Sequence, residues 1–253
     1  MKISAELESD TGGESELGHE PAGEAPGLVV AVDGPSGAGK SSASRGAARA
    51  LGLRYLDTGS MYRALTWWLL QAGIDLTDAA AVAGRAGEPV IEVSTDPERP
   101  WTRVDGTDVS AAIRTREVTN AVSAVATVPQ VRAHLIAQQR EIIAGAGGIV
   151  AEGRDIGTVV EPHAPVKVFL TADSGARAQR RETEASWSTQ AEVDRRDRLD
   201  AAQSGRAADA VEIDSTGLNL DEVVATIVQL AKERAAIPYQ QSPVHPGPRN
   251  KSR

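Results

Sequence analysis

Short apolar runs alternate with longer amphipathic stretches along most of the chain. This alternation is typical of βα units stacked on a parallel sheet that has helices on both faces. The sequence therefore predicts an α/β fold. The expected strands are Leu28–Val32, Arg54–Leu56, Gly148–Ala151, Val166–Leu170 and Ala210–Ile213, and the expected helices include Lys40–Leu51, Met61–Gln71 and Leu220–Ala235.

The last of these helices carries a start signal in the sequence. Asn219 stands where a helix cap is expected, and Glu222 follows three residues later. This is the spacing of a capping box, in which each side chain accepts a hydrogen bond from the other residue's backbone N–H. We therefore expect the helix to begin at Leu220.

The alternation breaks between about residues 75 and 140. The Asp-Gly pair at residues 105–106 favours a tight turn, and it predicts a hairpin with strands around Trp101–Val104 and Thr107–Val109. Two helical stretches should follow, separated at Pro129, because the residue before a proline is disfavoured in the helical conformation. We interpret this region as an insertion that forms a lobe over the edge of the sheet.

Three further segments differ in composition from the rest of the chain. Residues 1–27 carry seven acidic residues against one basic residue, and residues 237–253 are rich in proline, so neither segment buries enough apolar area to offset the entropy of ordering. We predict two disordered tails around a folded domain of residues 28–236. Residues 180–206 are highly charged with little apolar periodicity, and we expect them to form a mobile lid.

Charge and composition narrow the classes of partner. The formal net charge is -8, whereas a general nucleic-acid binder or anionic-membrane binder needs a basic excess. The absence of cysteine excludes disulfides and thiolate metal sites. Since the sequence has no apolar leader and no apolar run of membrane-spanning length, we expect a cytoplasmic, monomeric protein that acts on small molecules.

The segment "VVAVDGPSGAGKSS", residues 29–42, passes from a predicted strand through a glycine-rich turn into a helix. A glycine, four residues and then Gly-Lys-Ser form the phosphate-loop pattern, here in its usual strand-to-helix setting. Backbone N–H groups of such a loop surround phosphates, the lysine adds a positive charge, and the serine hydroxyl coordinates Mg²⁺. We therefore expect the β and γ phosphates of a nucleotide and Mg²⁺ at this loop, with Ser41 as the metal ligand. The expected nucleotide-binding residues are Gly34, Pro35, Ser36, Gly37, Ala38, Gly39, Lys40, Ser41 and Ser42.

A phosphate loop alone does not distinguish a kinase from a GTPase, an ATPase motor or a regulatory ATP sensor. The segment "DSTG" at residues 214–217 resembles a GTPase switch motif, but it follows the last predicted strand. No Asn-Lys-x-Asp guanine-reading motif accompanies it. We interpret the match as a coincidence.

Two polar turns follow other predicted strands. "LDTGSMYR" places Thr58 at the end of the second strand and Arg63 in the next helical turn, and "EGRDIGT" places Arg154 and Asp155 after the third strand. Ligands of open parallel sheets bind outside the carboxyl ends of the strands, so these side chains should face the phosphate loop across a crevice. Arginine there suits an anionic phosphate. For Arg63 alone, a surface ion pair is an alternative interpretation.

From about residue 28 to residue 235 the chain resembles the bacterial cytidylate kinases. These are nucleoside monophosphate kinases with a phosphate loop, a monophosphate-binding lobe, which would be residues 75–140 here, and a lid, which would be residues 180–206. The motif from residue 108 to residue 132 is the most specific, because the extended insertion that carries it separates these enzymes from adenylate, shikimate and gluconate kinases. The motifs of the resemblance are "DGPSGAGKSS", "LDTGSMYRA", "DVSAAIRTREVTNAVSAVATVPQVR", "EGRDIGTVVEPHAPVKVFLTA", "RRDRLD" and "DAVEIDST".

The resemblance implies that Ser123, Arg132 and Asp155 read cytosine. A carboxylate accepts a hydrogen bond from the N4 amine of cytosine, whereas uracil would turn its O4 acceptor toward Asp155. The other implied roles are acceptor-phosphate binding by Arg63 and Arg154, a sugar contact by Thr58, a ribose contact by Asp200, and catalytic charge from Lys40, Arg154 and Arg196.

The lid departs from the family pattern. Gln203 stands where a further lid arginine is expected, and the segment around it is several residues short. A lid arginine neutralises charge on the transferring phosphoryl group and can be worth about 10³- to 10⁵-fold in rate. Arg206 is the candidate replacement.

The expected function is therefore Mg²⁺-dependent transfer of the γ-phosphoryl group of ATP to CMP, with dCMP as a further acceptor. The first alternative is a catalytically weak or inactive nucleotide-binding relative, which the shortened lid would explain. The second is a kinase of another small acceptor such as UMP, which the combination of Arg132 and Asp155 disfavours.

Overall fold

A computed structural model describes residues 27–184, 195, 198, 199 and 205–235. The expectations for the two tails, up to residue 26 and from residue 236, lie outside the described residues. So do those for Arg196, Asp200 and Gln203.

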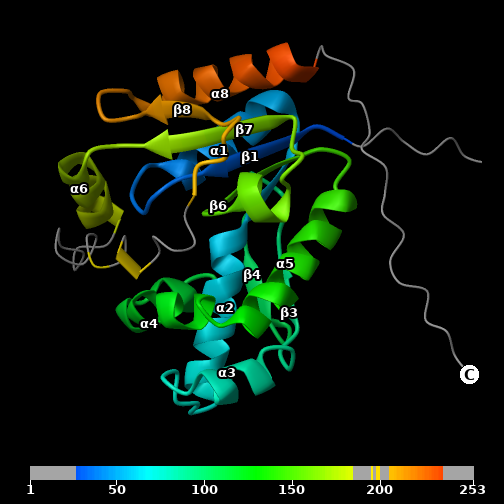
Figure 1. Ribbon diagram of the computed structural model, residues 1–253, viewed down its shortest axis with the longest axis vertical. Coiled ribbons are helices and arrows are strands. Elements are labelled where there is room, and N and C mark those ends of the chain that lie inside the picture. Colours follow the sequence, from blue (N-terminus) through cyan, green and yellow to red (C-terminus); the bar gives the residue numbers. More distant parts are fainter. Residues whose placement is uncertain (1–26, 185–194, 196–197, 200–204, 236–253) are drawn as a thin grey trace, which may run out of the picture.

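The core of the molecule is a parallel sheet whose strands follow the order β2-β6-β1-β7-β8 (Figure 1). Every neighbouring pair in this sheet is parallel, as predicted. The strand that leads into the phosphate loop, β1, lies at the centre, so the loop has a neighbouring strand end on each side. The strands are β1 (Val29–Asp33), β2 (Arg54–Asp57), β6 (Ile149–Gly153), β7 (Val166–Thr171) and β8 (Val211–Asp214), each within about two residues of its predicted bounds.

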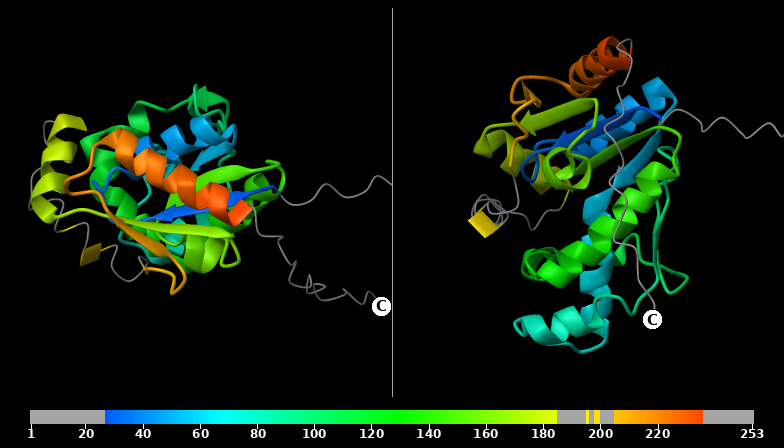
Figure 2. Two further views of the ribbon diagram at one scale, coloured as in Figure 1. Left: turned by 90° about the horizontal axis from the view of Figure 1, so that it is seen from above. Right: turned by 45° about the vertical axis from the view of Figure 1, so that its right-hand side comes forward.

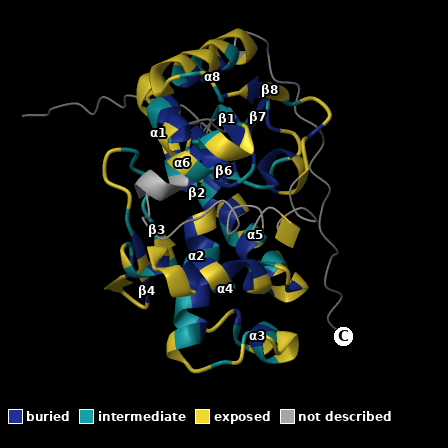
Figure 3. Cartoon of the chain, turned by 90° about the vertical axis from the view of Figure 1, so that its left-hand side faces the viewer, coloured by how far each residue is buried: buried dark blue, intermediate teal, exposed yellow. Residues whose placement is uncertain are grey.

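Helices cover both faces of the sheet, which confirms the predicted fold class. On one face α1 (Lys40–Leu51) and α8 (Leu220–Ala235) pack over alternate strand residues such as Val30 and Val32. On the other face α2 (Thr58–Gln71) and α5 (Pro129–Ala144) pack over the intervening residues, including Ala31. Figure 2 shows α8 lying across the strands from above, and Figure 3 shows the central strands in dark blue between exposed helix surfaces.

The start of α8 has both hydrogen bonds of the predicted capping box. The backbone N–H of Glu222 donates to Asn219 Oδ1 at 3.0 Å, and the backbone N–H of Asn219 donates to Glu222 Oε2 at 2.8 Å. Two N–H groups that a helix start leaves without helical partners are satisfied in this way.

Replacing Asn219 with alanine should lower the free energy of unfolding by about 1 kcal/mol. Neither Asn219 nor Glu222 lines the cavity that contains the residues expected to bind nucleotide, so kinetic constants should stay at the wild-type values. Urea unfolding of both proteins, followed by circular dichroism, measures the change. An unchanged midpoint would show that the bonds contribute nothing to stability.

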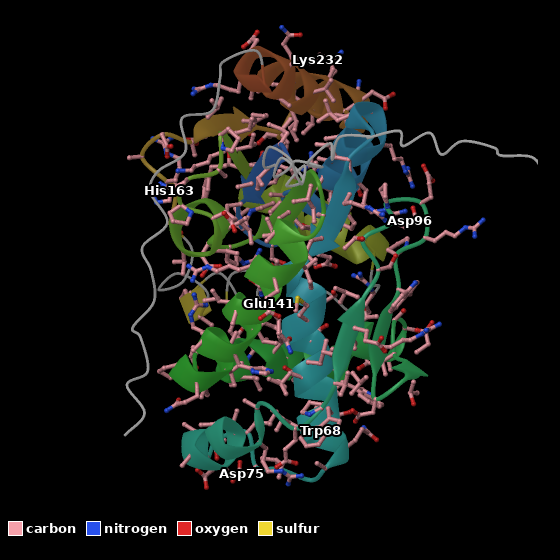
Figure 4. All side chains as sticks on the ribbon, turned by 90° about the vertical axis from the view of Figure 1, so that its right-hand side faces the viewer. Trp68, Asp75, Asp96, Glu141, His163 and Lys232 are labelled. Atoms are coloured by element: carbon pink, nitrogen blue, oxygen red, sulfur yellow. The ribbon has the colours of Figure 1, made fainter. Side chains whose placement is uncertain are left out.

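The chain between α2 and β6 forms an extension below the sheet, around the far end of α2. In Figure 4, Lys232 on α8 and Asp75, which precedes α3, mark opposite ends of the molecule. The predicted hairpin is present, and its turn has positive φ at both Asp105 and Gly106. The remaining elements are α3 (Ala79–Arg85), β3 (Ile91–Val93), β4 (Thr102–Val104), β5 (Thr107–Asp108), η1 (Ala112–Arg114) and α4 (Arg116–Ala126), with α5 beginning at Pro129.

The connection between β3 and β4 returns to the main sheet. The backbone N–H of Tyr55 in β2 donates to Thr95 O at 2.9 Å, and Arg45 of α1 donates to Pro97 O at 3.2 Å. Arg49 pairs with Glu98 at 2.9 Å. The small antiparallel sheet β3-β4-β5 is therefore attached to the edge strand β2 and to the helix that follows the phosphate loop.

Two further elements flank the carboxyl edge of the main sheet. A single π-helical turn, η2 (Ile156–Val160), follows β6, and α6 (Ser174–Glu184) follows β7. The first residues of the segment expected as a lid therefore belong to a helix. Arg206, the candidate replacement for a lid arginine, forms an ion pair with Glu212 of β8. No helix in the described part of the chain is long and apolar enough to cross a membrane.

Candidate active site

A cavity lies at the carboxyl edge of the sheet, where β1, β2 and β6 end. It is bounded by the phosphate loop on one side and by α2, α4 and the start of α5 on the other. Its lining residues are Ser36, Gly37, Gly39, Lys40, Ser41, Ser42, Asp57, Thr58, Gly59, Tyr62, Arg63, Arg114, Val122, Ser123, Ala126, Arg132, Glu152, Gly153, Arg154 and Asp155. Residues predicted from four separate motifs thus line one space.

The phosphate loop has the conformation that its glycines allow. Gly37 and Gly39 have φ of 79° and 89°, in the left-handed region that other residues rarely adopt. Gly34 is required for a second reason, since a Cβ atom there would lie 2.1 Å from the carbonyl oxygen of Leu170. The loop therefore folds tightly against β7 and turns into α1 at Lys40.

Lys40 lies inside the loop and is 8% exposed. Its Nζ donates to Pro35 O at 2.8 Å. Burial and the neighbouring Arg154 guanidinium lower its pKa to about 7, against the opposing attraction of Glu152, Asp33 and Asp57. An anion that binds in the cavity would raise the pKa of Lys40 and so favour its charged form.

Glu152 ends β6 and is buried at the floor of the cavity. Tyr55 Oη donates to Glu152 Oε1 at 2.5 Å. Burial and Asp57 raise the pKa of Glu152 to about 7, while Lys40 and hydrogen bonds from Tyr55 and Ser41 lower it. The Glu152 carboxyl group therefore lies beside the Ser41 hydroxyl group.

Asp33, at the end of β1, holds the phosphate loop next to the turn after β6. Its two carboxylate oxygens accept from the backbone N–H groups of Ile156 and Gly157, both at 2.8 Å. Burial raises the pKa of Asp33, and these two bonds oppose the shift. Arg154, from the same turn, donates to Gly34 O at 2.8 Å. These bonds hold the turn after β6 against the phosphate loop.

The predicted base-reading residues line the same cavity as Lys40. Arg132 Nη2 forms an ion pair with Asp155 Oδ2, and Ser123 of α4 lines the same wall. Tyr62 joins them, with its phenol among Arg132, Asp155 and Gln139. Burial raises the pKa of Tyr62 to about 12, so the phenol stays protonated and available as a donor.

The predicted phosphate and sugar residues line the middle of the cavity. Arg63 Nη1 donates to Thr119 Oγ1 at 2.8 Å and to Ile113 O at 3.2 Å, which anchors α2 to α4. Thr58 Oγ1 donates its hydrogen to Glu152 O at 2.7 Å, so toward a ligand this hydroxyl group can act only as an acceptor. Arg196 and Asp200 lie outside the described residues.

Four lining residues with polar or charged side chains were not assigned roles from the sequence: Asp57, Tyr62, Arg114 and Glu152. Glu152 had a usable signal, since an acidic residue directly after the apolar run "IVA" must end a buried strand. Asp57 caps α2 by accepting from Ser60 N at 2.9 Å and lies 3.4 Å from Arg114. Arg114 and Tyr62 depend on how the insertion packs, which local sequence patterns do not determine.

A central β1 leading through a phosphate loop into α1, with a cavity across the strand ends, is the architecture of the phosphate-loop nucleoside monophosphate kinases. Residues 30–233 match the profile of the cytidylate kinase family, described as "Cytidylate kinase". The chain belongs to this family, and it is an ATP-dependent phosphotransferase that phosphorylates CMP.

Curated relatives support the same family. The chain is 50% identical to the cytidylate kinase of Streptomyces avermitilis, over 83% of this chain and 95% of that protein. It is 51% identical to that of Streptomyces griseus, over 81% and 93% of the two chains. It is 49% identical to that of Nocardia farcinica, over 82% and 94%.

Proposed function

We propose that the cavity holds both substrates at once, with ATP on the phosphate loop and the cytosine of CMP between α4, α5 and η2. The observation that carries this proposal is a single cavity lined by Lys40 and Ser41 on one side and by Ser123, Arg132 and Asp155 on the other. The phosphoryl donor and acceptor would then meet beside Lys40 and Arg154. Turnover of ATP that depends on CMP tests the proposal.

In this proposal the base is selected by which of its groups donate hydrogen bonds and which accept them. Asp155 is an acceptor and would take the N4 amine of cytosine, while Arg132 is a donor suited to O2 or N3. The two side chains pair with each other in the structure, so neither is an unpaired buried charge before the base arrives. Uracil would place O4 against the Asp155 carboxylate, and such mismatches in buried polar sites are rejected by about 10⁴-fold or more.

The residues at the phosphate loop fit Mg²⁺. Ser41 and Glu152 offer a hydroxyl and a carboxylate side by side, and Mg²⁺ usually takes one or two protein oxygens together with substrate phosphates. No group of three or more acidic, histidine or cysteine side chains suited to a metal occurs among the described residues. When bound, the metal ion would neutralise charge on the donor phosphates.

Glu152→Gln should therefore raise the Mg²⁺ concentration needed for half-maximal velocity by about 10- to 100-fold. Glutamine keeps the shape of the side chain but loses its negative charge. A titration of velocity against Mg²⁺ at saturating ATP and CMP measures this shift. Tyr55→Phe is the matched control, because it removes the hydrogen bond to Glu152 and leaves the carboxylate. Equal Mg²⁺ requirements in wild type and Glu152→Gln would exclude Glu152 from the metal site.

Transfer needs no general base, because the acceptor phosphate is already ionised near neutral pH. The protein contributes position and charge instead. Lys40 would hold the transferring group, Arg63 and Arg154 would hold the acceptor phosphate, and Thr58 would lie by the sugar. The anchoring of Arg63 to α4 and of Arg154 to Gly34 fixes both guanidinium groups before substrates bind.

The proposal includes dCMP as an acceptor. It differs from CMP only at the ribose 2′ position, away from the base edge that Asp155 would read and the phosphate that Arg63 would bind. Arg196 and Asp200 stay predicted lid residues. A monomeric state and a cytoplasmic location likewise stay predictions.

A further inference from the structure

Ser215 lies directly behind the phosphate loop, in the "DSTG" segment after β8. It is 2% exposed. Its Oγ lies 3.1 Å from Ala38 O and 2.8 Å from Thr171 O, so its hydroxyl bridges the loop and the end of β7. The segment that resembles a GTPase switch motif therefore contacts the phosphate loop from its outer side.

Arg180 of α6 completes this contact. Its Nη1 donates to Ser215 Oγ at 2.9 Å and reaches Ala38 O at 3.4 Å, and its Nη2 donates to Ser215 O at 2.6 Å. Because Ser215 Oγ accepts from Arg180, its own hydrogen is left to donate to a carbonyl oxygen. Thr171 O at 2.8 Å and Ala38 O at 3.1 Å share the single hydroxyl hydrogen of Ser215, and Arg180 Nη1 adds a second donor 3.4 Å from Ala38 O.

Holding this carbonyl outward determines where the next N–H points. In a trans peptide the C=O of one residue and the N–H of the next point in opposite directions, and the structure has no cis peptide among the described residues. With Ala38 O directed away from the cavity, the N–H of Gly39 is directed toward it. Gly39 lines the cavity and has φ of 89°. Backbone N–H groups in this arrangement are the anion-binding groups of a phosphate loop.

The peptide between Ser36 and Gly37 is held in the same way. Arg177 of α6 donates to Ser36 O at 3.1 Å, which directs the N–H of Gly37 inward. Gly37 also lines the cavity. Arg177 and Arg180, three residues apart in α6, therefore contact two alternate carbonyls of the loop, Ser36 O and Ala38 O.

We propose that Ser215 and Arg180 are positioning residues for phosphate binding, which act by aiming the Gly39 N–H at the donor nucleotide's phosphates. The proposal rests on the proposed function of the loop as the ATP site. Neither side chain lines the cavity, so they act through the loop and not by touching substrate.

The test compares Ser215→Ala with Thr216→Ala. Thr216 lies in the same turn, where it donates to Asp214 and accepts from Asp173 N, and it makes none of the contacts to Ala38. Calorimetry gives Kd for ATP, for tripolyphosphate, which has no base, and for CMP. Ser215→Ala should bind ATP and tripolyphosphate about 3- to 10-fold more weakly, by the same factor for both, with Kd for CMP unchanged. Arg180→Ala should show the same pattern with a larger factor.

Each other outcome has a distinct meaning. If Thr216→Ala weakens the binding of tripolyphosphate as much as Ser215→Ala does, a general loosening of the turn explains the effect and the proposal is wrong. If the variants bind ATP more weakly but bind tripolyphosphate as the wild type does, the residues act on the adenosine part of ATP and the proposal is also wrong. If the wild-type protein binds neither ATP nor tripolyphosphate, the loop is not the ATP site and the proposed function itself fails.

Discussion

Replacing Lys40 with methionine is expected to lower kcat by about 10³-fold. Lys40 Nζ lies inside the phosphate loop, where it would balance the charge that spreads over the transferring phosphoryl group. Methionine fills a similar volume without this charge. Initial rates of ADP formation at saturating ATP and CMP measure the loss.

The variant should fold as well as the wild type. Burial lowers the pKa of Lys40 to about 7, which means that the folded protein disfavours its charged form. Removing that buried ammonium group should leave the thermal midpoint equal or higher. Kd for CMP should change by less than kcat does, because Asp155 and Arg132 would hold the base and Arg63 the acceptor phosphate without Lys40. A kcat within threefold of wild type would remove Lys40 from the catalytic role.

Replacing Asp155 with asparagine should lower kcat/KM for CMP by about 10²-fold and reduce the preference for CMP over UMP by a similar factor or more. Asparagine can turn its amide group to donate to O4 of uracil, whereas the carboxylate only accepts. The substitution also leaves Arg132 without its charged partner. Parallel kinetics with CMP and UMP measure both changes.

Two results limit the interpretation of this variant. Kd for ATP should stay at the wild-type value, since the Asp155 side chain would contact the base of CMP and no part of ATP, and a large change would indicate a wider rearrangement. A wild-type preference for CMP over UMP in Asp155→Asn would show that the base is read elsewhere, with Tyr62 and Ser123 as the first residues to examine.

Most of the main sheet could be predicted from the sequence, because parallel strands between helices are continuous apolar runs that need no tertiary information. The phosphate loop and the α8 cap are likewise local patterns with fixed spacing. The short strand β3 and helix α3 could not be predicted. β3 is three residues long and is held by pairing with β4, a contact between segments separated in sequence.

The site was predictable only where a motif marked it. Arg132 and Asp155 are 23 residues apart in sequence, and their ion pair depends on how α5 packs beside η2. The segment "DSTG" was interpreted as a chance match to a GTPase switch motif, and its contact with the phosphate loop had no sequence signal, because Ser215 and Ala38 are 177 residues apart. Such contacts arise from the order of strands in the sheet, which places β8 beside β7 and β7 beside β1.

The central claim is that one cavity brings ATP and CMP together for phosphoryl transfer. Its most direct test is ADP formation from Mg-ATP by the purified protein with CMP, dCMP, UMP, AMP or no acceptor. The account predicts rapid ADP formation with CMP and dCMP, little with UMP or AMP, and almost none without an acceptor. ADP formation at the same rate with every acceptor and with none would contradict it.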